Sequence, residues 1–377
     1  MTSELVFPIR VLHIVGSMGK GGIQSFLMNF YRHVNREKIQ FDFLIHIQSE
    51  KGYEDEIRDL GGKIYNQNMP SMRSLAGYIK EINRFLEEHK EYQIIHIHLR
   101  TVAALWTFVA RKKKRISIAH SHNTSNGSGK KALIKDLIQL PIRYQADFMF
   151  ACSHEAGEWL FGKKATRSDR FRVIPNAIDA KRFAFDPVKR EKTRCELRLQ
   201  NSFVLGHVGR MTEQKNHMFL LLVFKGVREQ QNNAKLLLVG DGELMEKIKL
   251  EARRLGVMED VLFMGAKSNT YDYYQAMDVF AFPSLYEGLG ISVIEAQANG
   301  LPCVVSDKVP KSADIGTDLF ISMDLSSGAE EWVKKILEVY NVPRKDYSKS
   351  VVRAGFDIEN NAEWIREFYE NLSHTRG

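Results

Sequence analysis

The 377-residue sequence predicts an α/β protein with two Rossmann-like, doubly wound domains in tandem. In each half, short apolar runs of strand length alternate with segments of helical periodicity, which indicates a parallel sheet with helices on both faces. Glycine or proline follows most of these runs, where a loop must begin. With 44% hydrophobic residues the chain can form two cores of ordinary size, which excludes a largely disordered protein.

The first half predicts short buried strands separated by helices or loops. The first strand leads into the glycine-rich loop GSMGKGG (16–22), after which the pattern becomes helical. Predicted strands cover residues 10–15, 41–45, 93–97, 116–119 and 148–151, and predicted helices cover 23–33 and 75–89.

The second half repeats this plan, and the charged segment 186–201, part of which could be helical, is the predicted linker. We therefore expect domains at 1–187 and 188–358, followed by a C-terminal helix at 359–377 that crosses back to the first domain. Predicted strands of the second half cover residues 203–208, 235–239, 261–264, 279–282 and 303–306, and predicted helices cover 216–229, 243–255, 270–276 and 291–299.

The excess of positive charge lies in the first half. Residues 1–187 hold 29 Lys and Arg against 19 Asp and Glu, a net charge of +10, whereas residues 188–377 hold 25 against 27, a net charge of −2. A basic surface attracts nucleic acid, membrane phospholipid or a phosphorylated substrate. Part of the charge is clustered, at 111–115 and at Lys130, Lys131 and Lys135. Scattered lysines alone would indicate only a solvated surface.

These three lysines belong to the segment KKALIKDLIQLPIRY, in which apolar residues recur at helical spacing. A basic amphipathic helix can lie on an anionic membrane, but the same pattern also describes a helix that faces a protein core. Both interpretations stay open.

The cysteines and the hydropathy pattern favour a cytoplasmic protein. Cys152, Cys195 and Cys303 are far apart and lack CxxC spacing, so we expect neither a disulfide framework nor a cysteine zinc site. No apolar run is long enough to cross a bilayer, and the N-terminus has no signal-peptide pattern. Peripheral contact with the inner face of the plasma membrane would follow if the basic segment binds lipid.

The segment SLYEGLGISVIE (284–295) is the strongest local motif. Glu287 lies in a loop after a strand and Glu295 lies in the next helix, with Gly288 and Gly290 at the turn between them. Backbone N–H groups at such a helix start can face an anion, which the helix dipole favours. Two carboxylates beside a phosphate-binding turn suit a sugar nucleotide. The alternative is an ordinary helix entry with two surface glutamates.

Two further loops follow strands. GHVGRMTEQK (206–215) carries Arg210 and Lys215, and two cations at this spacing can clamp a diphosphate. The loop 16–22 is also placed where open α/β sheets bind ligands. It matches neither the G-x-G-x-x-G nor the G-x-x-x-x-G-K-[ST] pattern, so a nicotinamide enzyme or a P-loop ATPase has little support.

Two H-x-H pairs end strands of the first domain, His96 with His98 and His120 with His122. Imidazoles are common metal ligands, but no carboxylate ligand is evident nearby in the sequence, so we expect no metal site. Period-2 spacing places both members of a pair on one face of the sheet, which a structural role could also explain. A functional role for His120 near the ligand cleft is the favoured interpretation.

Together these residues resemble the retaining glycosyltransferases of family 4, which have the two-domain GT-B fold with a central cleft. The resemblance covers nearly the whole chain and is narrower for bacterial exopolysaccharide and capsule transferases. It rests on Gly21-Gly22, His120 in AHSHN, the segment PNAID (175–179), Gly209-Arg210 with Lys215, GDG (240–242), VLFMG (261–265), the segment 283–295 and GLP (300–302).

The resemblance implies a donor site in the second domain and an acceptor site in the first. Arg210 and Lys215 would hold the donor diphosphate, Glu287 the sugar hydroxyls and Glu295 the ribose, with His120 near the transferred sugar. Gln24 stands where many members have a glutamate. Other donor-site residues would be Gly21, Gly22, Gly209, Met264, Gly288, Leu289, Gly290 and Ile291; acceptor or membrane contacts would come from Gln24, His98, Asn123, Lys130, Lys131 and Lys135.

The implied reaction moves a hexose-type sugar from a nucleotide sugar, UDP being preferred, to a saccharide acceptor on a polyprenyl diphosphate. It retains the anomeric configuration and needs no metal or other cofactor, because protein cations and helix ends balance the leaving diphosphate. Without a convincing covalent nucleophile, we expect same-face attack within a close ion pair, with the domains closing over the donor.

Two other interpretations remain. The same fold could serve a sugar-nucleotide epimerase or hydrolase, which would consume donor without an acceptor. A nucleic-acid-binding protein could use the basic half, but this lacks a recognisable binding module and leaves the segment 284–295 unexplained. We therefore expect no nucleic-acid partner.

Overall fold

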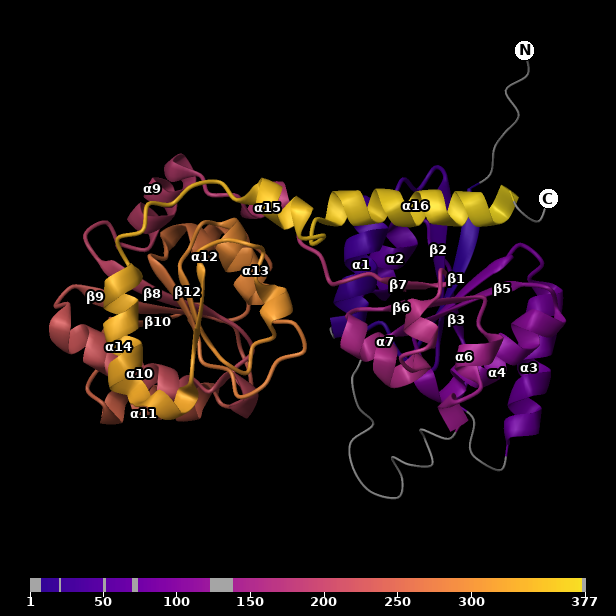
Figure 1. The fold of residues 1–377 in the computed structure, drawn as a ribbon, viewed down its shortest axis with the longest axis horizontal. Helices are drawn as coiled ribbons and strands as arrows, with labels where there is room; N and C mark the ends of the chain where they lie inside the picture. The colour runs from indigo at the N-terminus through magenta and orange to yellow at the C-terminus, as the bar shows by residue number, and fades with distance from the viewer. Residues whose placement is uncertain (1–7, 20–21, 50–51, 70–73, 123–137, 375–377) are drawn as a thin grey trace, which may run out of the picture. The chain divides into compact units, whose positions relative to one another are not determined.

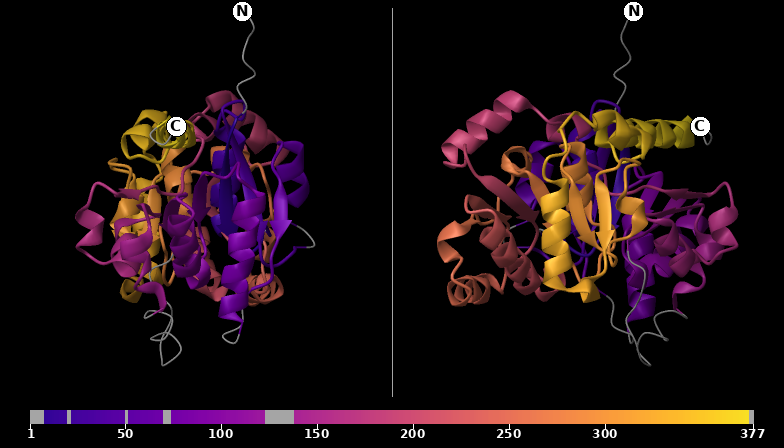
Figure 2. Two further views of the ribbon diagram at one scale, coloured as in Figure 1. Left: turned by 90° about the vertical axis from the view of Figure 1, so that its right-hand side faces the viewer. Right: turned by 60° about the vertical axis from the view of Figure 1, so that its left-hand side comes forward.

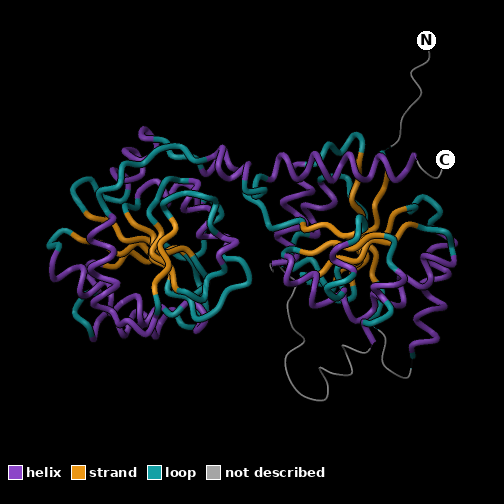
Figure 3. The backbone as a smooth tube through the Cα atoms, viewed as in Figure 1, coloured by secondary structure: helices purple, strands orange, loops and turns teal. Residues whose placement is uncertain are grey.

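The computed structural model describes residues 8–19, 22–49, 52–69, 74–122 and 138–374. The chain divides into two compact units, Met1–Ala177 with Ile358–Gly377, and Ile178–Asp357. A parallel sheet forms the centre of each unit and helices lie outside it (Figure 3). The predicted α/β, Rossmann-like architecture of both halves is confirmed.

The sheet of the first unit has seven strands in the order β3-β2-β1-β4-β5-β6-β7. Every neighbouring pair is parallel. The strands are β1 (Ile9–Val15), β2 (Ile39–Ile45), β3 (Ile64–Asn66), β4 (Ile94–Ile97), β5 (Ile116–Ser121), β6 (Phe148–Ala151) and β7 (Phe171–Val173). The helices are α1 (Gly22–His33), α2 (Glu54–Asp59), α3 (Leu75–Glu88), α4 (Arg100–Lys112), α6 (Ile142–Gln145), α7 (His154–Phe161), η1 (Ala165–Arg167) and α16 (Ile358–His374).

Alternation along β1 assigns the helices to the two faces of this sheet. Val11 and Val15 belong to the core with α1 and α16, whereas Leu12 and Ile14 belong to the core with α3, α4 and α7. The C-terminal helix α16, yellow in Figures 1 and 2, packs on α1, β1, β2 and β4. Its Tyr369 is fully buried.

The sheet of the second unit has six strands in the order β10-β9-β8-β11-β12-β13, again all parallel. The strands are β8 (Phe203–Val208), β9 (Ala234–Val239), β10 (Val261–Phe263), β11 (Val279–Phe282), β12 (Cys303–Ser306) and β13 (Phe320–Met323). The helices are α8 (Ala180–Phe183), α9 (Pro187–Glu196), η2 (Glu213–Lys215), α10 (His217–Gln230), α11 (Met245–Arg254), η3 (Met258–Asp260), α12 (Thr270–Ala276), α13 (Ile291–Ala298), η4 (Lys311–Ala313), η5 (Leu325–Ser327), α14 (Gly328–Val339) and α15 (Ser348–Arg353).

Part of the predicted linker is the helix α9, which packs within the second unit and does not connect the two units. Asp186 caps α9 by accepting from the N–H groups of Val188 and Lys189. Arg190 and Arg194, one helical turn apart, both pair with Asp278. The charged side chains of this segment therefore hold α9 in place. The boundary between the two units lies after Ala177, whereas we predicted it after residue 187.

In the described part of the chain, no helix is both long enough and apolar enough to cross a membrane.

Candidate functional site

The strand order of the second sheet reverses between β8 and β11, which are neighbours in its middle. Open parallel sheets bind ligands at this kind of position, outside the carboxyl ends of the two strands. Residues 209–216 follow β8 and residues 283–290 follow β11. Most of the residues predicted to bind the donor lie on these two loops.

An ion pair joins the two loops. Lys215 Nζ donates to Glu287 Oε1 at 2.6 Å and lies 4.5 Å from the ring centre of Phe282. The side chains of Lys215 and Glu287 are only 15% and 7% exposed, so each charge depends on the other for compensation. The pair places a cation and a carboxylate at the same point of the fold.

The N-terminus of α13 opens at this position. Gly290 is its N-cap and has a φ of +83°, a left-handed conformation that glycine adopts without strain. No side chain caps the helix, so N–H groups of its first turn remain available to an anion. Gly288 is exposed, whereas Leu289 and Ile291 pack partly against the core. This segment has the geometry of an anion-binding turn.

Glu295 lies on the second turn of α13 and is held by Tyr274. The hydroxyl of Tyr274 donates to Glu295 Oε2 at 2.7 Å and lies 3.2 Å from the carbonyl oxygen of Ser292. Burial raises the pKa of Glu295 to about 7, although the hydrogen bond from Tyr274 acts in the opposite direction. The carboxyl group therefore changes charge close to neutral pH.

The loops after β8, β9 and β10 pack backbone against backbone. Gly240 has a φ of +145°, and a Cβ atom there would lie 1.9 Å from the carbonyl oxygen of Gly209. The N–H of Gly240 donates to Gly265 O at 2.9 Å, and that of Met264 donates to Leu238 O at 2.9 Å. Met264 thus lies two strands, roughly 10 Å, from β8 along the same edge of the sheet.

Two buried histidines, for which no role was predicted from the sequence, pack beside the loop that follows β8. His207 Nδ1 donates to Ala281 O at 2.9 Å, because a carbonyl oxygen can only accept. His217 lies with its ring centre 4.7 Å from that of His207. Burial lowers the pKa of both rings, with the charge of Lys215 acting in the same direction, so they stay neutral beside it. A Cβ on Gly209 would meet His207 Nε2 at 2.9 Å.

The first unit gathers five histidines on one face of its sheet, under α1 and α16. His13 is on β1, His96 is on β4 and His120 is on β5, while His98 and His122 directly follow β4 and β5. His98 Nε2 lies 3.0 Å from His13 Nδ1, and His98 Nδ1 lies 2.8 Å from His122 Nε2. Each H-x-H pair shares a face, as its spacing predicts.

A second chain of contacts reaches the C-terminal helix. His96 Nε2 lies 3.1 Å from His120 Nδ1, and His96 Nδ1 lies 2.7 Å from the hydroxyl of Tyr369 on α16. His120 is 2% exposed, and burial lowers its pKa well below the usual range. The side chain predicted to lie near the transferred sugar is thus a neutral, buried ring within unit 1.

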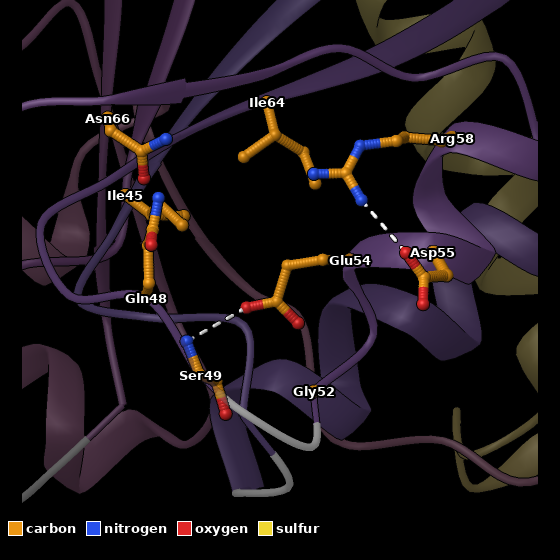
Figure 4. A pocket seen from close by; sticks show the side chains of 9 residues that line it. All are labelled: Ile45, Gln48, Ser49, Gly52, Glu54, Asp55, Arg58, Ile64 and Asn66. Atoms are coloured by element: carbon orange, nitrogen blue, oxygen red, sulfur yellow. Dashed lines mark hydrogen bonds and ion pairs between the residues drawn. The ribbon is translucent and has the colours of Figure 1, made fainter.

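A polar cavity of about 320 Å³ lies beside the carboxyl ends of β2 and β3 in the first unit. Figure 4 shows Glu54 accepting from the N–H of Ser49 at 3.2 Å and Arg58 donating to Asp55 at 2.9 Å. Its lining consists of Ile45, Gln48, Ser49, Gly52, Glu54, Asp55, Arg58, Ile64 and Asn66. Amide and carboxylate groups of this kind can bind hydroxyl groups.

Comparison with known proteins decides the family. Residues 20–182 match the family model described as Glycosyltransferase Family 4, and residues 189–354 match that described as Glycosyl transferases group 1. EpsF of Bacillus subtilis strain 168, a protein named as a glycosyltransferase, is 31% identical over 374 residues, 97% of each chain. The chain belongs to glycosyltransferase family 4.

Two further proteins are similar to this chain over nearly its whole length. A UDP-Gal:α-D-GlcNAc-diphosphoundecaprenol α-1,3-galactosyltransferase of Escherichia coli is 24% identical over 385 residues, 97% of each chain. The crystal structure of Anabaena HepE with UDP has a TM-score of 0.76 at 18% identity, covering 96% of this family 4 transferase and all of HepE. The second likeness confirms the GT-B fold, and the predicted family resemblance is confirmed as well.

Within this family 4 transferase, the predicted donor residues separate into two groups. Gly209, Lys215, Glu287, Glu295 and the turn 288–291 lie on the loops after β8 and β11 or on α13, with Arg210 exposed beside them. Gly22 begins α1 in the other unit, where Gln24 Nε2 donates to Ser17 O at 2.9 Å. Gly21, Asn123, Lys130, Lys131 and Lys135 lie outside the described residues. The roles of all these residues stay predictions.

Proposed function

We propose that this family 4 transferase moves a hexose-type sugar from a UDP-sugar to a saccharide carried on a lipid diphosphate, during assembly of a bacterial exopolysaccharide or capsule. The Lys215–Glu287 pair beside the uncapped start of α13 is the observation that carries this proposal. It combines a cation, a carboxylate and backbone N–H groups at the strand-order reversal of unit 2, which is the set a nucleoside diphosphate sugar requires.

Relatives support the choice of donor and acceptor. The E. coli relative is named for UDP-Gal and for a diphosphoundecaprenol acceptor, and HepE has been crystallised with UDP and with UDP-glucose. In unit 1, the polar cavity beside β2 and β3 offers amide and carboxylate groups for a saccharide (Figure 4). We assign the donor to unit 2 and the acceptor saccharide to this cavity.

In the proposed reaction, the bond between the sugar's anomeric carbon and the diphosphate oxygen breaks before the acceptor oxygen attacks from the same face. The acceptor's proton passes to the leaving diphosphate. Arg210, Lys215 and the start of α13 stabilise the charge that develops on that diphosphate, so the step requires no metal ion. Glu287 orients the sugar through its hydroxyl groups, and the configuration at the anomeric carbon is retained.

The proposal is tested by incubating the protein with UDP-hexoses and a synthetic lipid-diphosphate saccharide, with and without EDTA. We expect one UDP-hexose to give an elongated lipid product of retained configuration by NMR, unaffected by EDTA. The product should be lost in Arg210→Ala and Glu287→Gln but kept in Glu330→Gln, a control at the start of α14. Donor consumption without acceptor would instead indicate a hydrolase or an epimerase.

Membrane contact is a separate part of the proposal. Exchanging Lys130, Lys131 and Lys135 together for glutamate should weaken binding to vesicles that contain anionic phospholipid, because each lysine near such a surface contributes about 1 kcal/mol. Co-sedimentation measures this, and equal binding by the variant and the unchanged protein would reject the membrane role.

A further inference from the structure

The two H-x-H segments of the first unit end neighbouring strands. Ile97 of β4 pairs with Ala119 of β5, so the residues that follow them, His98 and His120, continue the same register. Period-2 spacing adds His122 on the same face as His120. Three imidazoles from two central strands therefore converge at the carboxyl end of the sheet.

Their nitrogen atoms lie at distances suited to a shared ligand. One ring nitrogen of each of His98, His120 and His122 lies within 4.8 Å of the other two. His98 Nδ1 and His122 Nε2 are 2.8 Å apart, and His120 Nε2 is buried without a hydrogen-bond partner among the described residues. His98 and His120 are buried and His122 is partly buried, and a neutral imidazole offers the lone pair of one ring nitrogen.

The remaining nitrogens of the two deeper rings are bound by neighbours. His98 Nε2 contacts His13 Nδ1 at 3.0 Å, and His120 Nδ1 contacts His96 Nε2 at 3.1 Å. His96 is held in turn by Tyr369. Metal-ligating histidines characteristically have the second ring nitrogen hydrogen-bonded in this way, which fixes the ring and its tautomer.

We propose that His98, His120 and His122 bind one divalent transition-metal ion, with Zn²⁺ as the preferred ion, through His98 Nδ1, His120 Nε2 and His122 Nε2. Three neutral imidazoles favour Zn²⁺, Co²⁺, Ni²⁺ or Cu²⁺ over the oxygen-seeking Mg²⁺ and Ca²⁺. No metal site was predicted from the sequence because no carboxylate ligand was evident, but the fold brings the two H-x-H pairs together so that a third histidine takes that place.

The geometry requires a small adjustment. Zinc–nitrogen bonds of about 2.0–2.1 Å at tetrahedral angles separate two ligand nitrogens by roughly 3.4 Å. The present 2.8 Å between His98 and His122 must therefore widen. His122 is partly exposed whereas His98 and His120 are buried, so we expect the ring of His122 to make this adjustment. This site lies in unit 1 and does not depend on the donor chemistry proposed for unit 2.

The test uses the full chain without a polyhistidine tag, stripped with EDTA and then titrated with Zn²⁺ by calorimetry. We expect one equivalent to bind, and Co²⁺ in its place to give the visible absorption of a tetrahedral nitrogen site. His98→Gln and His120→Gln should weaken Zn²⁺ binding by more than the roughly 10- to 100-fold typical of losing a residue that is hydrogen-bonded to a ligand, and Tyr369→Phe, which reaches His120 only through His96, should weaken it by less. Mg²⁺ at millimolar concentration should not compete.

His217→Gln is the matched control, because His217 is also a buried histidine whose two ring nitrogens lack hydrogen-bond partners among the described residues. It should bind Zn²⁺ as the unchanged protein does. Circular dichroism identifies any variant that fails to fold, and His122→Gln, at the more exposed ligand, provides a further test. No stoichiometric Zn²⁺ binding by the unchanged protein, or equal binding by His98→Gln, His120→Gln and His122→Gln when folded, would overturn the proposal. Neither outcome depends on transferase activity.

Discussion

Donor binding should strengthen as the pH rises through neutrality, because the ribose contact predicted for Glu295 requires an ionised carboxylate. Burial raises the pKa of this carboxyl group to about 7. Below that pH it is protonated, and its acidic hydrogen occupies an oxygen that the donor would use. A UDP-sugar is a suitable probe, because its diphosphate diester keeps a constant charge over this range.

The size of the effect follows from the ionised fraction. With a pKa of about 7, that fraction is about 0.09 at pH 6 and about 0.9 at pH 8, so the apparent Kd should fall about tenfold between them. Glu295→Gln keeps the shape of the side chain but cannot ionise. Its Kd should be raised and nearly independent of pH.

Calorimetric titration of the UDP-sugar that is the donor, at pH 6, 7 and 8, measures this directly. Glu330→Gln, an exposed acid on α14, serves as the control and should keep the slope of the unchanged protein. A flat profile in the unchanged protein, or an equal slope in Glu295→Gln, would refute the reasoning about Glu295.

Four other predictions follow from the structure. Lys215→Met should lower the free energy of unfolding by about 3 kcal/mol in denaturant titrations, because it leaves a buried carboxylate uncompensated. Adding Glu287→Gln should restore most of that loss. If the stability changes of the two substitutions simply add, the two side chains are not coupled and the reasoning is wrong. Gly240→Ala should weaken donor binding or prevent folding, since its Cβ would meet a backbone oxygen of the loop after β8. Gly77→Ala, at an exposed helical position with open space around it, should instead stabilise the protein by about 0.8 kcal/mol in the same titrations. Asn66→Ala should raise the KM for the saccharide acceptor and leave the donor Kd unchanged, and unchanged acceptor kinetics would exclude the cavity beside β2 and β3.

The raised pKa of Glu295 also predicts how stability depends on pH. Folding favours the protonated form, so this contribution is fully present below about pH 4.5 and is lost as the pH rises to about 7. Glu295→Gln should therefore be more stable than the unchanged protein at pH 8, by at most about 3 kcal/mol. Unfolding of the two proteins at pH 5 and pH 8 compares the difference, which should be small at the lower pH.

Central strands were predictable because they are short, apolar and bounded by glycine or proline. The predicted ranges 148–151, 203–208, 279–282 and 303–306 coincide with β6, β8, β11 and β12. The strands β3, β7 and β13 escaped prediction because they lie at sheet edges, are three or four residues long and alternate partly exposed side chains without a clear apolar run. None of their residues is fully buried, so they impose little pattern on the sequence, whereas the edge strand β10 buries Val261 and was predicted.

The individual residues of the candidate donor site were predictable from the sequence, but the contacts between them were not. Lys215 and Glu287 were each recognised by the residues around them, yet the two are 72 positions apart in the sequence and pair only because β8 lies beside β11. Tyr274 was not recognised as the partner of Glu295, because a tyrosine on a short helix carries no local sign of where its hydroxyl points. Such partners are determined by how α12 and α13 pack on the same sheet.

The histidine cluster shows most directly how strand order adds to what local spacing predicts. Spacing alone placed the two rings of each H-x-H pair on one face. It could not include His13, which precedes His96 by more than eighty positions and joins the cluster only because β1 lies between β2 and β4. Because β1 lies beside β4, the ring of His13 contacts the Nε2 atom of His98, while the hydroxyl of Tyr369 on α16 contacts His96. Packing of two strand ends does not require a set of buried imidazoles that are hydrogen-bonded to one another and to Tyr369. Zinc titration of the full chain decides whether these contacts orient the rings for a metal ion.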